Sequence, residues 1–169
     1  LVRIARPTET SVSVATVKAN ERVSHTSEDD LIAGFIKAAE DLIERRCNRS
    51  IMRQKFRLVV PTILSTVTLF RPPMEGEITV TAASLTRDGE TTALDHEVAV
   101  LGISSMLPTA TFDAGTPGRG MMTIEYETGA ATAGDVPPGI AHAVLLLASH
   151  YYKSREAAAT DIRMKAADK

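Results

Sequence analysis

The sequence predicts an α+β protein: two amphipathic helices packed beside a small antiparallel sheet of short strands, with an extended N-terminal arm, a long loop and a C-terminal tail. Apolar residues recur with a helical period near both ends of the chain and alternate with polar residues between them. A run of strands flanked by helices is typical of the α+β class. A chain of 169 residues is long enough to bury a core, so we expect an arm at 1–12, one α+β domain at 13–157 and a tail at 158–169.

The N-terminal third predicts one short and one long helix. Residues 1–12 are rich in Thr, Ser and Arg, which predicts an extended arm unless a contact holds it. Ser13 is the candidate N-cap of a short helix over 14–23. The segment SHTSEDDLIAGFIKAAEDLIERRCNRS predicts a helix of about twenty residues that starts after the candidate N-cap Ser27 and ends near Asn48. Its predicted apolar face consists of Leu31, Ile32, Phe35, Ile36, Ala39, Leu42 and Ile43.

From residue 52 onward the apolar residues alternate, as they do in strands with one wet face. RQKFRLVVP and TVTLFRPP predict two strands, each ended by proline, and EVAVL predicts a further short one. In EITVTAASLTRDGETTALD, the dipeptide Asp88-Gly89 predicts a tight hairpin turn. MMTIEYET predicts the last strand, and residues 102–120 before it predict a long loop with a short strand at 110–112.

The segment VPPGIAHAVLLLASHYYKSREA, residues 136–157, predicts a helix that begins with a proline in its first turn. One stripe of this helix is apolar and is formed by Ile140, Ala143, Val144, Leu147, Tyr151 and Ser154. Leu145 and Tyr152 flank that stripe, and Leu146 lies near the polar face. Leu146 should therefore be either a partner contact or a mild cost in solubility. The excess apolar width makes Leu145, Leu146 and Tyr152 our candidates for contact with neighbouring subunits.

Composition limits the partners that the chain can bind. Nineteen basic and 21 acidic residues give a net charge of −2, too small for a field that attracts nucleic acid or anionic lipid over the whole surface. Cys47 is the only cysteine, so we expect no internal disulfide and a reducing compartment. We also expect no membrane partner, because the first residues lack the apolar core of a secretory signal and no segment reaches about 18 apolar residues.

No motif in the sequence predicts catalysis. His142 and His150 are eight residues apart, which puts them about 80° apart on a helix and two turns along it, so they cannot share one metal ion. GTPGRG at 115–120 lacks the Lys-Ser/Thr of a phosphate-binding loop. We therefore predict no catalytic residue, no metal ligand and no cofactor. The rival interpretation is a small ligand-binding or enzymatic domain with a polar cleft near His96 or His150.

The order of four segments resembles the head-tail connector family of tailed bacteriophages, also called adaptor or head-completion proteins. The segments are EDDLIAGFIKAAEDLIERRCNRSI, QKFRLVV, LFRPPMEGEITV and VPPGIAHAVLLLASHYYKSREA. The family's last helix opens with Val-Pro and closes with an aromatic-Tyr-x-x-Arg-Glu pattern, which Tyr151, Tyr152, Arg155 and Glu156 match. Asn48-Arg49 matches the family's Thr-Gly-Arg-like corner imperfectly, with Asn in place of Gly. The resemblance covers about residues 11–157.

The resemblance implies a structural virion protein that is not an enzyme. It would form a homo-oligomeric ring, a dodecamer in this family, under the portal protein, and link the DNA-filled capsid to a downstream neck or tail protein. Genomic DNA would pass through without specific binding. The expected location is the virion neck, and the host cytoplasm during assembly.

The same family analogy makes the C-terminal tail the candidate for portal contact. The residues expected to bind the portal protein are Ile162, Arg163, Met164 and Lys165. The alternative within the virion is another ring component, such as a stopper or a tail terminator.

Overall fold

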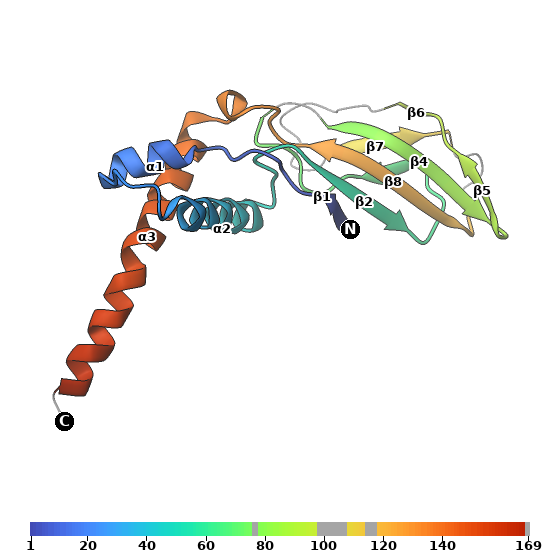
Figure 1. Ribbon diagram of the computed structural model, residues 1–169. Coiled ribbons are helices and arrows are strands. Elements are labelled where there is room, and N and C mark those ends of the chain that lie inside the picture. Colours follow the sequence, from blue (N-terminus) through green and yellow to red (C-terminus); the bar gives the residue numbers. More distant parts are fainter. Residues whose placement is uncertain (76–77, 98–107, 114–117, 168–169) are drawn as a thin grey trace. The chain divides into compact units, whose positions relative to one another are not determined.

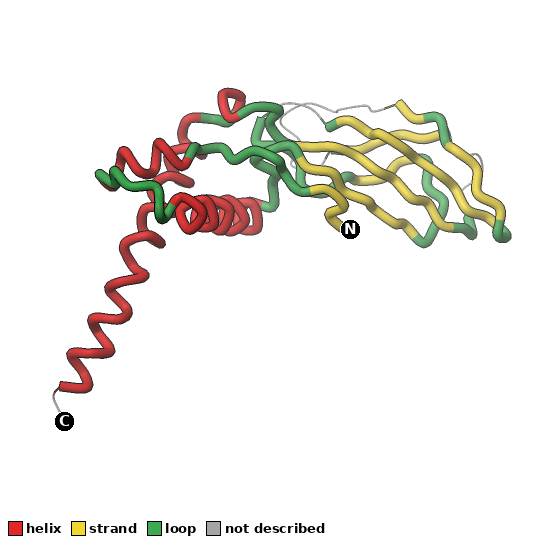
Figure 2. Tube along the Cα trace, in the orientation of Figure 1, coloured by secondary structure: helices red, strands yellow, loops and turns green. Residues whose placement is uncertain are grey.

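The computed structural model describes residues 1–75, 78–97, 108–113 and 118–167 of the chain (Figures 1 and 2). The chain divides into two compact units: a β unit, formed by residues 1–9 and 47–136, and a helical unit, formed by 10–46 and 137–169. The predicted boundaries at 12/13 and 157/158 stay predictions.

Three helices form the helical unit: α1 (Val14–Glu21), α2 (Asp29–Cys47) and α3 (Pro138–Ala167). Ser13 caps α1 as predicted, since its hydroxyl accepts a hydrogen bond from Thr16 N at 3.1 Å. The prediction that Ser27 caps α2 is wrong by one residue: Ile32 N donates to Glu28 O (2.9 Å), and the Ser27 hydroxyl contacts the His25 ring instead. The predicted end of α2 is confirmed, because the next residue, Asn48, has a φ of 52°.

The core of the helical unit forms where α1 and α2 face α3. Val17, Ile36 and Val144, one from each helix, have no exposed surface. The Phe35 and Tyr151 rings lie 6.3 Å apart, so α2 and α3 pack together as predicted. The buried row of α2 is rotated relative to the predicted stripe, since Leu31 is 42% exposed while Glu40 and Glu44 are buried. The buried residues of α2 are Ile32, Ile36, Ala39, Glu40 and Glu44, and four of them follow one another at intervals of four residues.

The strands of the β unit divide into two antiparallel sheets, which confirms the α+β class and its short strands but adds a second sheet to the one predicted. The five-stranded sheet has the order β1 (Val2–Ala5), β2 (Gln54–Val60), β8 (Met121–Thr128), β4 (Thr79–Arg87) and β5 (Glu90–Ala93). The three-stranded sheet has the order β3 (Thr66–Thr68), β7 (Thr109–Phe112) and β6 (His96–Glu97). A short 3₁₀ turn, η1 (Ala133–Asp135), follows β8.

Both sheets contribute to one hydrophobic core. Phe56 and Leu58 of β2 pair in register with Tyr126 and Ile124 of β8, and all four side chains point into the core. The core members from the three-stranded sheet are Val67, Ala110 and Phe112. The predicted alternation is thus confirmed: one face of β2 and β8 is buried, and the other, called here the outer face, is in contact with water.

Local backbone chemistry explains two connections of the β unit. Asp88 and Gly89 both have positive φ values (52° and 87°), which suits the two-residue hairpin turn that the sequence predicted between β4 and β5. The N-terminal arm is held in place over residues 2–5, because β1 pairs with β2. The Arg3 guanidinium also lies 5.8 Å from the centre of the Phe56 ring.

Substitution of Gly129 tests the backbone conformation at the end of β8. Its φ is 107°, and a Cβ atom there would overlap the carbonyl group of Met52. We expect Gly129→Ala to lower the free energy of unfolding by about 3 kcal/mol, because strain and overlap add. Gly34→Ala in α2 is the matched control, since no atom lies within 4 Å of its added Cβ, and it should gain about 1 kcal/mol in helix propensity. Urea unfolding followed by circular dichroism measures both; equal stability of the two variants would contradict the assignment.

Candidate functional site

Residues 70–73, which follow β3, form a segment with an anchored backbone, called here the 70–73 segment. The Tyr126 hydroxyl donates to Phe70 O at 2.8 Å. Arg71 O accepts from two hydroxyls, Ser50 Oγ and Thr128 Oγ1, each at 3.1 Å. Burial raises the pKa of Tyr126 far above its ordinary value, so its hydroxyl stays protonated and can donate. β8 therefore fixes this segment from the core side of the sheet.

The next two carbonyls of the 70–73 segment are bound by the corner that follows α2. Pro72 O accepts from Ser50 N at 2.9 Å, and Pro73 O accepts from the Arg49 guanidinium at 2.9 Å. Arg49 belongs to the Asn48-Arg49 pair of the family resemblance, and Ser50 directly follows it. The predicted strand through TVTLFRPP ends early, at Thr68, because the carbonyls of residues 70–73 bind the corner and β8 instead.

The anchored backbone presents one aromatic side chain to solvent. Phe70 is 41% exposed, although the neighbouring Leu69 has no exposed surface. Arg71, which follows, has a φ of 58°, a left-handed conformation that costs a non-glycine residue about 1 kcal/mol or more. Phe70 is therefore an exposed aromatic residue on a segment whose carbonyls are hydrogen-bonded, and a fixed backbone of this kind favours a contact role.

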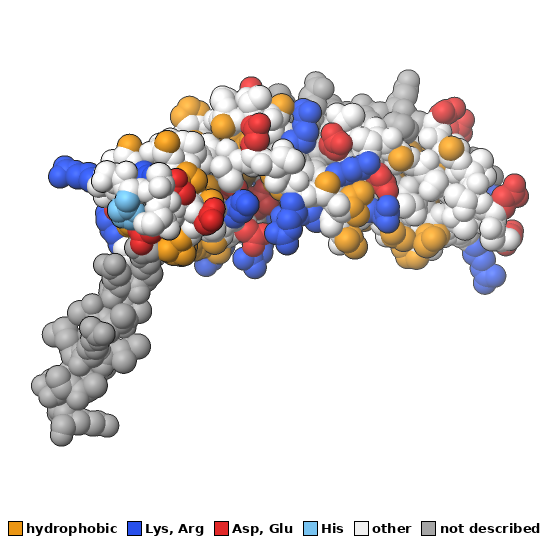
Figure 3. Space-filling view, in the orientation of Figure 1, with side chains coloured by type: hydrophobic (Ala, Val, Ile, Leu, Met, Phe, Trp, Pro, Cys, Tyr) orange, Lys and Arg blue, Asp and Glu red, His pale blue; other side chains and the backbone are white. Residues whose placement is uncertain are grey.

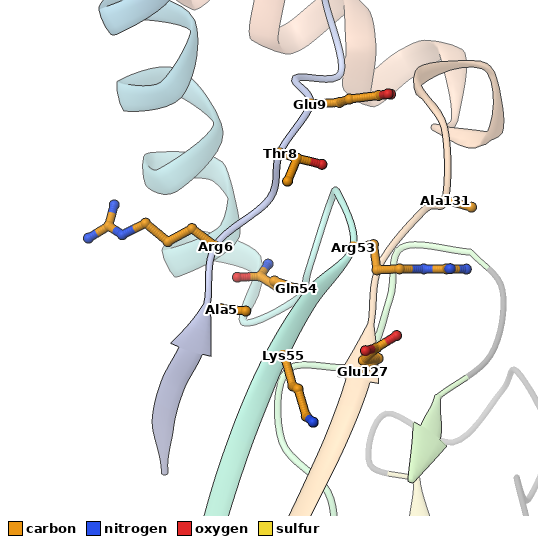
Figure 4. A pocket seen from close by; sticks show the side chains of 9 residues that line it. All are labelled: Ala5, Arg6, Thr8, Glu9, Arg53, Gln54, Lys55, Glu127 and Ala131. Atoms are coloured by element: carbon orange, nitrogen blue, oxygen red, sulfur yellow. The ribbon is translucent and has the colours of Figure 1, made fainter. Parts of the chain in front are cut away.

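A polar pocket of about 230 Å³ lies where residues 5–9 leave the sheet beside the start of β2 (Figure 4). Arg6 and Arg53 extend from opposite sides of it, and Lys55 and Glu127 project from neighbouring strands. The remaining lining residues are Ala5, Thr8, Glu9, Gln54 and Ala131. Charges of both signs border the pocket, and most of its lining residues are exposed, so it is open to a partner.

The outer face of the five-stranded sheet carries an ion-pair network. Glu125 lies 2.9 Å from Lys55 and 2.7 Å from Arg57 across β2 and β8. The hydrogen bonds from Lys55 and then Arg57 hold the pKa of Glu125 below its ordinary value. Val59 and Met121 on the same face are 45% and 44% exposed, and Figure 3 shows basic, acidic and apolar side chains interspersed on the strands. This mixed surface is suited to a polar protein contact.

The predicted subunit-contact residues on α3 have different surroundings. Leu146 is 54% exposed, between the exposed side chains of His142 and His150 on the same helix. Leu145 is half-buried, and the Tyr152 hydroxyl donates to Glu28 Oε2 at 2.5 Å within the helical unit. Leu146 is therefore the most accessible of the three.

The predicted portal-contact residues Ile162, Arg163, Met164 and Lys165 lie in the last turns of α3, and their side chains are outside the described residues. The side chain of His96, near which the rival interpretation expected a cleft, is also outside them. His150 is exposed, and not at the edge of the buried face of α3.

Buried polar contacts within the helical unit were missed in the sequence. Glu40 is 8% exposed and accepts from both the backbone N and the hydroxyl of Ser11, each at 2.6 Å. Burial raises the pKa of Glu40, and the Ser11 hydrogen bonds oppose that effect only in part. The sequence does contain a signal for this burial, because Glu40 and Glu44 continue the four-residue spacing of the buried residues Ile32 and Ile36.

A second polar cluster fixes α1 to α3. Lys153 Nζ lies 3.0 Å from Glu21 Oε2, and Asn20 Nδ2 donates to Ser149 Oγ at 3.0 Å. Burial alone would raise the pKa of Glu21, but the hydrogen bond from Lys153, aided by Ser149 and Asn20, outweighs it and lowers the pKa. These contacts set the rotation of α1 on α3.

Within the described ranges, no three His, Cys, Asp or Glu side chains are grouped as a metal site requires. None of the helices in that part of the chain combines the length and apolar character needed to cross a membrane.

Solved structures share this fold. A chain from the neck of an empty GTA particle, computed with C6 symmetry, has a TM-score of 0.73 and 24% identity, over 90% of this chain and 83% of that one. A chain from the virion of a native gene transfer agent (GTA) particle has a TM-score of 0.70 and 24% identity, with the same coverage. A chain from a native GTA neck computed with C12 symmetry has a TM-score of 0.60 and 23% identity, over 89% and 83%. The fold is therefore one that particle subunits adopt.

The family comparison is more specific. The model of the head completion protein (HCP) family matches residues 10–161, and the chain belongs to this family. The predicted resemblance is confirmed, and with it the assignment to the head-completion proteins of a virion. None of the curated proteins matches the sequence.

The two buried carboxylates Glu40 and Glu21 predict opposite pH dependences. A carboxyl whose pKa is raised by folding stabilises the fold fully below its unfolded pKa, near 4.5, and loses that contribution as the pH rises through the folded value. Glu40→Gln keeps an acceptor for Ser11 without a charge, so the stability of this variant relative to the wild type should increase from pH 4 to pH 7.

Glu21→Gln is the matched control with the opposite sign. The lowered pKa of Glu21 stabilises the fold above the unfolded pKa, and this contribution is lost as the pH falls through the folded value. The variant should therefore lose stability relative to the wild type as the pH rises. Urea unfolding at several pH values measures both differences, and parallel pH profiles would contradict the two assignments.

Proposed function

We propose that the protein is a head-tail connector (adaptor) that forms a ring under the portal protein, links the DNA-filled capsid to the neck or tail, and surrounds the genome exit channel. The observation that carries the proposal is the family match over residues 10–161. The shared fold with chains of neck structures that have C6 and C12 symmetry supports a ring, with twelve subunits as the proposed number. The role is structural and not enzymatic.

The charge of the chain suits this role. Each phosphate that a protein neutralises adds affinity for DNA, and a channel that grips its cargo would slow ejection. A net charge of −2 favours passage of the genome without specific binding. The proposed partners are the portal protein, a downstream neck or tail protein and further copies of the chain. The proposed locations are the virion neck and, during assembly, the host cytoplasm.

Two surfaces of α3 are proposed as contacts. Leu146, with 54% of its surface exposed, is proposed to lie between adjacent copies of the chain, where its burial would remove apolar surface from water. Residues 162–165 are proposed to bind the portal protein. The 30 residues of α3 extend over about 45 Å, so one helix can carry both contacts without strain.

Electron microscopy of the assembled particle tests the connector role. We expect density for this protein as a closed ring that touches the portal directly, with Leu146 buried between adjacent copies. A ring located further along the neck or tail would support the stopper or terminator alternative instead. A monomer bound elsewhere would contradict any ring role.

Deletion of residues 158–169 tests the portal contact. The truncated chain should keep its fold, because the removed residues lie after the buried positions Val144 and Ala148 of α3. Circular dichroism should then show an unchanged midpoint of thermal unfolding, while co-sedimentation with portal-bearing heads should fall at least tenfold. Unchanged attachment to the heads would count against a portal contact in this region.

A further inference from the structure

We propose that residues 13–27, called here the strap, open by local unfolding while α2 and α3 stay folded, and that opening lengthens the exposed surface of α3 around Leu146. The strap consists of Ser13, α1 and the connection to α2. All of these elements belong to the helical unit. The use of the lengthened surface rests on the function proposed above, whereas the opening itself is a property of the free chain.

The strap is anchored on both sides. Before it, Ser11 and Val12 are buried, and Glu40 of α2 accepts two hydrogen bonds from Ser11, each at 2.6 Å. After it, the Tyr152 hydroxyl of α3 donates to Glu28, the residue that precedes α2. These two anchors confine an opening to the residues that lie between them.

Between the anchors, the strap buries little apolar surface. Val17 is the one buried residue within 13–27, a range that the structure describes in full. Most of the stability of a helix in a protein comes from the packing of its apolar face. α1 has only eight residues, and an isolated helix shorter than about 12–15 residues is marginal in water. Once α1 leaves α3, it should therefore lose its helical structure as well.

Polar contacts hold the strap closed. They join Lys18 to Asp29 of α2, Asn20 to Ser149 of α3 and Glu21 to Lys153 of α3. In each of the two ion pairs one side chain is accessible to water, since Asp29 is 41% exposed and Lys153 is 69% exposed. Exposed ion pairs are screened by salt and contribute little to stability. The contacts therefore define where α1 lies without holding it strongly.

Opening of the strap uncovers a side of α3 that continues from Leu146. Residues three and four apart lie on the same side of a helix, and Ser149 follows Leu146 by three positions and precedes Lys153 by four. Leu146 is 54% exposed, whereas Ser149, which accepts a hydrogen bond from Asn20, is 4% exposed. The closed strap thus ends the exposed surface at Ser149. A contact that uses the longer surface shifts the strap towards its open state.

Hydrogen exchange of the free chain, measured on the whole protein, tests the opening. The amides of α1 should exchange about a hundredfold faster than those in the middle of α2, after correction for their intrinsic rates. Lys153→Gln removes the charged partner of Glu21, so it should speed exchange in α1 by about a further threefold and leave α2 unchanged. Equal protection of α1 and α2 in the wild type would overturn the strap.

Arg45→Gln is the matched control for Lys153→Gln. Arg45 is exposed to a similar degree, 63%, and its ion pair with Asp41 lies within α2. This variant should leave the exchange of α1 unchanged. If the two variants sped exchange in α1 equally, the effect would be a general loss of stability, and the local opening would be contradicted.

Ser13→Ala tests the use of the strap in assembly. The hydroxyl of Ser13 caps α1, so its loss favours the open state, and portal-bearing heads should take up this variant about fivefold faster than the wild type. Ser13→Thr keeps a capping hydroxyl and should behave as the wild type does.

The outcomes separate the inference from the proposed function. Faster exchange of α1 in Ser13→Ala without faster uptake by heads would overturn the role of the strap in assembly and leave the connector role intact. A wild-type protein that never joins portal-bearing heads would refute the connector role, whatever the hydrogen exchange of the free chain shows.

Discussion

The hydrogen bonding of the 70–73 segment is the constraint on which the β unit depends. The carbonyls of all four residues accept hydrogen bonds. The donors are Arg49 and Ser50 after α2, and Tyr126 and Thr128 of β8. A carbonyl that loses its partner on burial costs about 1–3 kcal/mol, so the corner, β3 and β8 are held as one structure. Pro72 and Pro73 have no N–H group that needs a partner, so their carbonyls are the backbone groups that must be satisfied.

The strands could be predicted from the sequence, but their division into two sheets could not. Alternation shows which face of a strand is buried, and it was sufficient for β2, β8 and the hairpin at Asp88-Gly89. It does not show which strand is the neighbour. Val67 and Ile124 have the same kind of apolar pattern, yet they lie in different sheets of one core. Sheet membership is set by contacts between residues distant in the chain, such as β3 with β7.

The candidate site was predictable only in part, for a similar reason. Helical periodicity identified Leu146 as surplus to the core, and the structure leaves it exposed. It could not show that Tyr152 is bonded to Glu28, because that contact joins residues 124 positions apart. The pocket and Phe70 produced no local signal. The pocket is formed by three chain segments, and the sequence pattern around Phe70 predicts an ordinary strand, whereas β3 ends at Thr68. The family, in contrast, was recognisable from the order of its motifs.

The helical unit is fixed by polar contacts where apolar ones would be more stable. Burying Glu40 and Glu21 costs desolvation, and paired or hydrogen-bonded buried charges seldom gain more than they lose. What such contacts provide is a single arrangement: Asn20 and Glu21 fit α3 only where Ser149 and Lys153 face them. Leu146 takes no part in these contacts and is 54% exposed. In a head-completion protein, a fixed rotation of the helices determines which surface of α3 stays available to a partner, and this is a reason to keep polar contacts that add little stability.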